Sequence, residues 1–175
     1  MKFSLLFLTT LLFCEVSFAQ QSAFPKDWVG NWKGELIWMR SGKTDTTRVP
    51  VQLRIHPADS INTYTWQIIY GSAGDDNRPY LLKPVDPAKG HWVVDEKNGI
   101  LLDQFLIGNR LCGAFTVQQS TIINQYWLEG NRLMIEFLNV GAQTLHSTGK
   151  GTEDSPVVNS YKVASYQKAE LRKEN

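Results

Sequence analysis

The chain has 175 residues, with 18 Lys and Arg against 17 Asp and Glu, so its formal net charge is +1. A chain of this length is typical of a single domain and can bury a sizeable core. The balanced charge argues against nucleic acid or an anionic membrane as the main partner, because both favour a basic surface. The composition is neither that of a disordered chain nor that of a collagen-like repeat.

Residues 1–19 have the pattern of a secretory signal peptide. Lys2 supplies the positive start, residues 3–13 are mostly apolar, and Ser17 and Ala19 place small side chains where a signal peptidase cleaves. We therefore predict cleavage after Ala19 and export to the periplasm or the extracellular space. The apolar run is too short to span a membrane, so no transmembrane segment is predicted.

The two cysteines fall on either side of the predicted cleavage site. Cys14 leaves with the signal peptide and Cys112 stays, so the exported chain cannot form an internal disulfide. Two alternatives remain for the N-terminus: an uncleaved anchor, or a lipoprotein modified at Cys14. No base accompanies Cys112 in the sequence, which favours a small buried apolar residue over a reactive thiol. Its role is otherwise left open.

The rest of the chain consists of short β runs separated by turn signals. Residues 49–55 alternate apolar and polar side chains with the period of two expected for a half-buried strand. Asn98-Gly99 is typical of a two-residue hairpin, since both of its turn positions need positive φ. The pattern predicts ten strands: 32–39, 49–55, 64–70, 78–83, 91–94, 100–107, 110–118, 121–129, 132–140 and a last one from 161 toward 171.

These strands follow one another through short connections with almost no helix. An open antiparallel sheet of this size tends to curl, and closure removes its exposed edges. The sequence therefore predicts an all-β, up-and-down antiparallel barrel of about 8–10 strands, formed by residues 20–175 as one domain. A two-sheet sandwich is the alternative. Residues 168–173 could instead form a short helix, and this point stays open.

Gly30, Trp32 and Gly34 form a G-x-W-x-G motif at the start of the first strand. This motif and the strand pattern resemble the calycin barrels, which comprise lipocalins, fatty-acid-binding proteins and nitrobindin-like haem barrels. The resemblance implies that Trp32 caps one barrel end and packs against a basic residue of the last strand, for which Arg172 is the candidate. The physical basis is that a guanidinium group can stack on an indole face.

Aromatic side chains recur on one face of several predicted strands. A barrel of this size either is filled by side chains or holds one small ligand. Tyr and Trp add polar groups to an apolar wall, which suits a hydrophobic or amphipathic ligand. We therefore predict an exported, lipocalin-like small-molecule-binding protein of unknown oligomeric state, with a wall formed by Trp38, Tyr64, Trp66, Tyr70, Trp92, Phe115, Tyr126 and Phe137.

Motifs for catalysis or metal binding are scarce. The three histidines have no close spacing, so no metal site is predicted. Asp95 and Glu96 lie next to the Asn98-Gly99 turn, and adjacent strand residues point to opposite faces, which argues against a shared acid–base site. No catalytic residue is predicted, and whether the protein is an enzyme is left open.

Three other functions remain possible. The first is haem binding with His146 as the iron ligand, and no other cofactor is predicted. The second is a barrel-type lyase or isomerase, and the third is a filled barrel that binds another protein. Arg78, Arg110 and Arg132 are expected near strand ends, where an inward-pointing arginine would suit a carboxylate or phosphate group.

Overall fold

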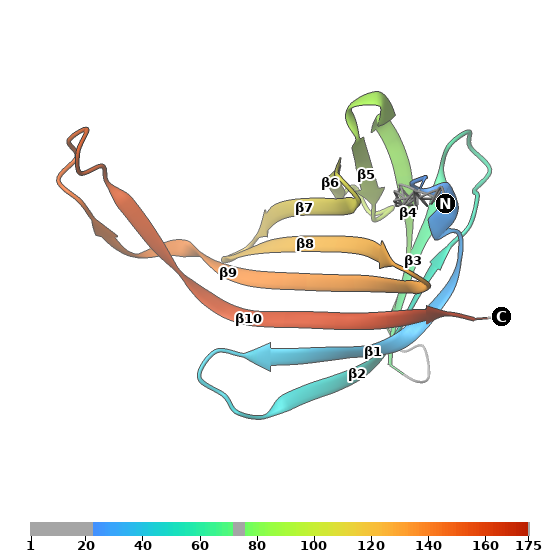
Figure 1. Cartoon of the computed structure of the whole chain (residues 1–175), viewed down its shortest axis with the longest axis horizontal. Coiled ribbons are helices and arrows are strands. Elements are labelled where there is room, and N and C mark those ends of the chain that lie inside the picture. Colours follow the sequence, from blue (N-terminus) through green and yellow to red (C-terminus); the bar gives the residue numbers. More distant parts are fainter. Residues whose placement is uncertain (1–22, 72–75, 175) are drawn as a thin grey trace, which may run out of the picture.

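The computed structural model describes residues 23–71 and 76–174, so the predicted signal peptide lies outside the described residues. Ten antiparallel strands form one closed barrel in which each strand pairs with its sequence neighbours and β1 also pairs with β10 (Figure 1). The strands are β1 (Gly30–Arg40), β2 (Thr46–Ile55), β3 (Tyr64–Tyr70), β4 (Asp76–Asp86), β5 (His91–Asp95), β6 (Leu101–Ile107), β7 (Arg110–Val117), β8 (Ser120–Glu129), β9 (Arg132–Thr148) and β10 (Val158–Lys173). This topology confirms the predicted up-and-down barrel and is consistent with the calycin resemblance.

Helical structure in the described part of the chain is limited to two short 3₁₀ turns, η1 (Lys26–Trp28) and η2 (Pro87–Lys89). Neither is long or apolar enough to cross a membrane. The predicted alternative of a helix at 168–173 is wrong, because these residues continue β10. They pair with β1, with Lys168 opposite Ile37 and Arg172 opposite Lys33.

The alternating pattern of β2 shows how the sequence builds the barrel. Val51, Leu53 and Ile55 are buried, whereas Gln52 and Arg54 between them are partly exposed. Successive strand side chains point to opposite faces, so one apolar set faces the barrel interior and the polar set faces solvent. A shift of one residue in register would reverse both sets, and burial of one face therefore fixes the register.

One end of the barrel is filled by aromatic side chains, and we call it the closed end. Trp28, on η1, is 1% exposed and packs edge-on against Phe24 with ring centroids 4.8 Å apart. Phe24 also packs against Trp92 at 5.2 Å, and Trp28 lies 6.4 Å from Trp66. The N-terminal turn thus covers the closed end with large apolar side chains.

Trp32 caps this end as the motif implied, but its basic partner is Lys173 and not Arg172. Lys173 Nζ lies 5.5 Å from the centroid of the Trp32 ring, and Trp32 Nε1 donates a hydrogen bond to the Trp28 carbonyl at 2.8 Å. Gly30 has φ +148, and a Cβ at this position would collide with the Lys173 side chain. Glycine at position 30 therefore allows the lysine to cross the end of the barrel.

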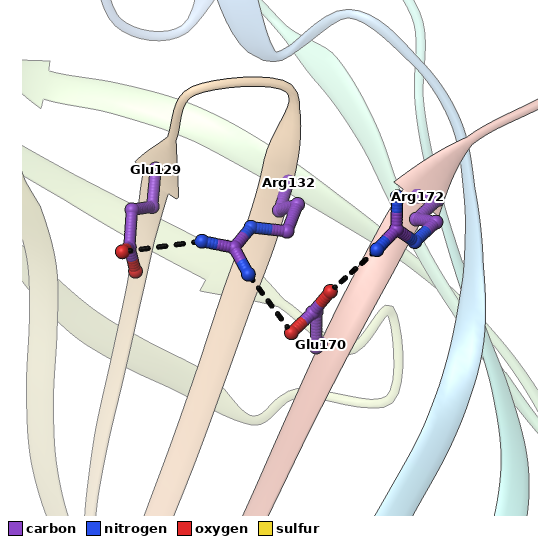
Figure 2. A network of polar contacts seen from close by, with 4 residues as sticks. All are labelled: Glu129, Arg132, Glu170 and Arg172. Atoms are coloured by element: carbon purple, nitrogen blue, oxygen red, sulfur yellow. Dashed lines mark hydrogen bonds and ion pairs between the residues drawn. The ribbon is translucent and has the colours of Figure 1, made fainter.

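Arg172 belongs to the outer wall because Lys173, one residue later, is paired with Trp32 and shares its face. Figure 2 shows Arg172 bound to Glu170, which also accepts from Arg132, while Arg132 donates to Glu129. This chain of ion pairs runs across β8, β9 and β10. The predicted basic partner of Trp32, Arg172, lies one residue before the observed partner, Lys173. Because successive side chains of a strand point to opposite faces, Arg172 points away from Trp32.

Strands β9 and β10 continue past the barrel as a two-stranded arm (Figure 1). In the arm, Thr144 pairs with Tyr161 and Thr148 with Val158. Residues 142–149 are exposed, so no alternation of burial marks them as a strand. This explains why the predicted strand stopped at residue 140.

Candidate ligand-binding site

The half of the barrel opposite the closed end contains two adjoining spaces. The outer pocket, of about 390 Å³, lies at the barrel mouth, and the inner pocket, of about 80 Å³, lies deeper. Tyr70, Arg78, Phe115 and Phe137 line both. Seven further residues line the outer pocket alone: Leu36, Trp38, Val49, Asp76, Ile122, Asn139 and Gln167. Nine further residues line the inner pocket alone: Trp66, Ile68, Tyr80, Val94, Glu96, Leu102, Gln104, Asn124 and Tyr126. The outer volume is within the range of small-molecule sites, which are about 300–1,000 Å³.

A row of polar side chains forms one wall of the inner pocket. Gln104 on β6, Gly113 on β7 and Asn124 on β8 face inward, and Asn124 pairs directly with Gly113 in the strand register. A Cβ at Gly113 would collide with Gln104 Nε2 and would lie 2.6 Å from Asn124 Oδ1. Glycine at this position therefore leaves the space in which the two amides meet across β7.

The amide pair is deeply buried and only partly satisfied. Asn124 Nδ2 donates to Gln104 Oε1 at 2.7 Å, with Gln104 1% and Asn124 2% exposed. Three buried polar atoms of the two pockets have no hydrogen-bond partner among the described residues: Asn124 Oδ1, Trp38 Nε1 and Asn139 Oδ1. Buried polar atoms in proteins are nearly always hydrogen-bonded, so these three atoms are exceptions, and all three belong to residues that line the two pockets.

The charged groups of the site lie near its mouth. Arg78 binds Asp76 with two hydrogen bonds, Nε to Oδ1 at 2.9 Å and Nη2 to Oδ2 at 2.6 Å. The guanidinium also lies over the Tyr70 ring, 5.0 Å from its centroid. The hydrogen bond lowers the pKa of Asp76 and raises that of Arg78, so both groups are charged at neutral pH. Glu96, which lines the inner pocket, adds a second carboxylate.

Three tyrosines contribute hydroxyl groups to the inner pocket. Burial raises the pKa of Tyr70, although the nearby Arg78 acts in the opposite direction. Burial raises the pKa of Tyr126 further, and burial followed by the charge of Glu96 raises the pKa of Tyr80. Raised pKa values keep these hydroxyls protonated at neutral pH, so each can donate or accept a hydrogen bond.

The structure brings together six of the eight aromatic residues predicted for the ligand wall. These six line the two pockets: Trp38, Trp66, Tyr70, Phe115, Tyr126 and Phe137. Tyr64 and Trp92 line neither pocket and are buried in the core cluster, which also includes the pocket residues Trp66 and Tyr126. Trp92 is held by its edge-on contact with Phe24, a residue for which the sequence predicted no role.

Asp95, the last residue of β5, and the adjacent Glu96 do not share a site. Asp95 forms an ion pair with Lys83 at 2.5 Å, and Glu96 lines the inner pocket. His146 is exposed on the arm, opposite Ser160, and does not reach either pocket.

The remaining polar candidates lie on the outer wall. Arg110 lies over Trp127, 4.0 Å from the ring centroid, and Arg132 belongs to the chain of ion pairs in Figure 2. Cys112 is partly exposed rather than fully buried, and burial raises the pKa of its thiol while Arg110 acts to lower it. A raised pKa disfavours the reactive thiolate.

The sequence analysis missed Gln104, Asn124 and the pairing of Arg78 with Asp76. Gln104 follows Leu102 at a spacing of two, and Asn124 precedes Tyr126 at the same spacing. Since residues two apart in a strand share a face, this spacing indicates an inward position for both amides. What the sequence does not show is that the two amides meet over Gly113.

No protein-family model matches the chain, and a search of curated proteins gave no match. Among solved structures, the fold is similar to that of a protein of unknown function from the DUF3598 family of Nostoc punctiforme PCC 73102. The TM-score is 0.61 at 10% sequence identity, over 85% of this chain and 48% of the other. The chain thus spans about half the length of that structure, and the similarity is one of fold.

Proposed function

We propose that this protein binds a small amphipathic molecule non-covalently inside the mouth half of the barrel, and that it does so after export from the cytoplasm. The observation that carries the proposal is the contrast between the two halves of one barrel. The closed end is packed with Trp and Phe, whereas the mouth half contains an outer pocket of about 390 Å³. Cores are ordinarily packed without such voids.

The lining supports a ligand with both apolar and polar parts. Leu36, Phe115, Ile122 and Phe137 provide apolar surface around the outer pocket. Asn124 Oδ1 and Trp38 Nε1 provide an acceptor and a donor that the described residues leave without a partner. An apolar space with a few convergent polar groups is the usual form of a small-molecule site. The secretory pattern of residues 1–19 supports the proposal of export.

The proposal is tested by blocking the outer pocket and measuring the binding of a neutral fluorescent probe, N-phenyl-1-naphthylamine. Ile122 lines the outer pocket, whereas Ile123 is 43% exposed on the opposite face of β8. We expect Ile122→Trp to weaken probe binding at least ten-fold, because the larger ring occupies the space that the probe needs. Ile123→Trp, the matched control, should bind the probe as the wild type does.

Circular dichroism of both variants shows whether the barrel is retained. Absence of probe binding by the wild type, or equal binding by wild type, Ile122→Trp and Ile123→Trp, would contradict a ligand site in the mouth half.

A further inference from the structure

The charges around the two pockets do not favour an anionic ligand. The charged side chains among the described lining residues are Arg78, Asp76 and Glu96, which leave one net negative charge. An inward arginine would by itself suit a carboxylate or phosphate. Here, however, Nε and Nη2 of Arg78 are already bound to the two oxygens of Asp76.

Arg78 is also held on its flat face, because the guanidinium lies over the Tyr70 ring. A ligand carboxylate would therefore have to displace Asp76 from a two-point contact, or approach Arg78 beside a carboxylate of the same charge. Like charges at short range repel each other, so the Asp76 carboxylate opposes a second anion beside Arg78. The arrangement thus stabilises the protein's own ion pair at the expense of an anionic guest.

Two unpartnered amide oxygens in the pockets point the same way. Asn124 donates its Nδ2 to Gln104, which leaves the carbonyl oxygen of Asn124 as the available atom. Asn139 Oδ1, on the wall of the outer pocket, is likewise without a partner among the described residues. Carbonyl oxygens accept hydrogen bonds, so they bind N–H and O–H groups and repel an anionic head group.

We infer that the barrel selects an uncharged amphipathic molecule that carries an N–H or O–H donor, and that Asp76 is the residue that excludes anionic relatives of that molecule. This inference rests on the proposed function and specifies its ligand class. At the barrel mouth, Asp76 neutralises the charge of Arg78. In the inner pocket, the carbonyl oxygen of Asn124 accepts a hydrogen bond from the N–H or O–H group of the ligand. Residues of the apolar wall contribute affinity without distinguishing charged from neutral guests.

Two probes with the same ring system test this inference. N-phenyl-1-naphthylamine is neutral and has one N–H, and 1-anilinonaphthalene-8-sulfonate adds a sulfonate. We expect the wild type to bind the neutral probe at least ten-fold more tightly than the anionic one. Asp76→Asn leaves the charge of Arg78 uncompensated, so this preference should fall at least ten-fold. Glu96→Gln removes the second carboxylate and should lower the preference in the same direction.

The matched control is Asp103→Asn, which makes the same change in net charge. Asp103 is paired with His91 on the outer wall and lines neither pocket. It should leave both affinities unchanged. Some anionic probe will bind outside the pocket, and this surface binding is the part that Ile122→Trp does not weaken. It is subtracted from the total binding of that probe.

Equal, pocket-dependent binding of the two probes by the wild type overturns the inference while leaving the proposed function intact. An unchanged preference in both folded variants, Asp76→Asn and Glu96→Gln, also overturns it. Failure of both probes to enter the pocket contradicts the proposed function itself, so the two failures are distinguishable.

Discussion

Gly113 decides whether the inner pocket can contain its polar wall. The residue lies between Gln104 and Asn124, and a side chain there would occupy the position of the two amides. Both amides are almost completely buried, so displacing them leaves polar atoms without partners in the barrel interior. An unsatisfied buried polar group costs about 1–3 kcal/mol.

We expect Gly113→Ala to lower the free energy of unfolding by about 2–4 kcal/mol, as overpacking and the lost amide contact combine. Urea unfolding followed by tryptophan fluorescence measures this change. The control is Gly141→Ala, because a Cβ at Gly141 would meet its nearest neighbour at an ordinary 3.7 Å. A loss of stability in Gly113→Ala no larger than in the control would show that the amide row tolerates a side chain.

The contacts of single side chains were harder to predict from the sequence than the strands. The motif around Trp32 predicted a cap with a basic partner, and the partner is Lys173 because strand register places it, and not Arg172, opposite Trp32. Arg78 was expected near a strand end, where the structure places it. The ion pair between Arg78 and Asp76 depends on the side-chain conformations of both residues at the barrel mouth. A pattern of residue types in the sequence does not predict these conformations.

The strands of the barrel and those of the arm differ in how much apolar surface they bury. In the barrel, Leu133 and Ile135 of β9 are buried at 0% and 2% exposure. In the arm, the same strand pairs with β10 alone, and several apolar side chains are exposed: Leu145, Val158 and Tyr161. Two-stranded ribbons without a packed face are marginally stable in water.

We therefore expect amide hydrogen exchange to separate the two parts of β9. Amides of residues 144–148 should exchange by local opening, at least a hundred-fold faster than those of residues 133–137, because fewer buried contacts resist their opening. Hydrogen–deuterium exchange with mass spectrometry of peptides from each segment measures the difference. Equal protection of both segments would mean that the arm is packed against another surface in solution.

The contrast between barrel and arm explains how well the strands could be predicted. Strand β3 was predicted with its observed bounds, 64–70, because alternation of apolar and polar residues records the burial of one face. The extension of β9 to Thr148 was missed because its backbone pairing involves no buried face. Alternation therefore predicts the strands that enclose the core and fails for strands that leave it.

At the scale of the whole molecule, aromatic side chains pack the closed end of the barrel, and two pockets lie in the mouth half. The sequence predicted ten strands in their correct order, and it placed most of the aromatic wall. It could not distinguish a hollow barrel from a filled one, since that depends on how inward side chains from non-neighbouring strands meet after closure. The aromatic residues Tyr64 and Trp66 show this, because they are two positions apart in β3 and only Trp66 borders a pocket.

The most direct test of the account follows the tryptophan indole N–H signals by NMR as the neutral probe is added. Trp38 lines the outer pocket and its Nε1 has no partner among the described residues, whereas Trp32 Nε1 is bound to the Trp28 carbonyl at the closed end. If the probe binds in the mouth half, the Trp38 signal shifts as the probe is added and reaches a plateau at saturation, whereas the Trp32 signal does not move. A saturable shift of Trp32, or of Trp127 on the outer wall, with Trp38 unchanged would contradict a ligand site in the mouth half of the barrel.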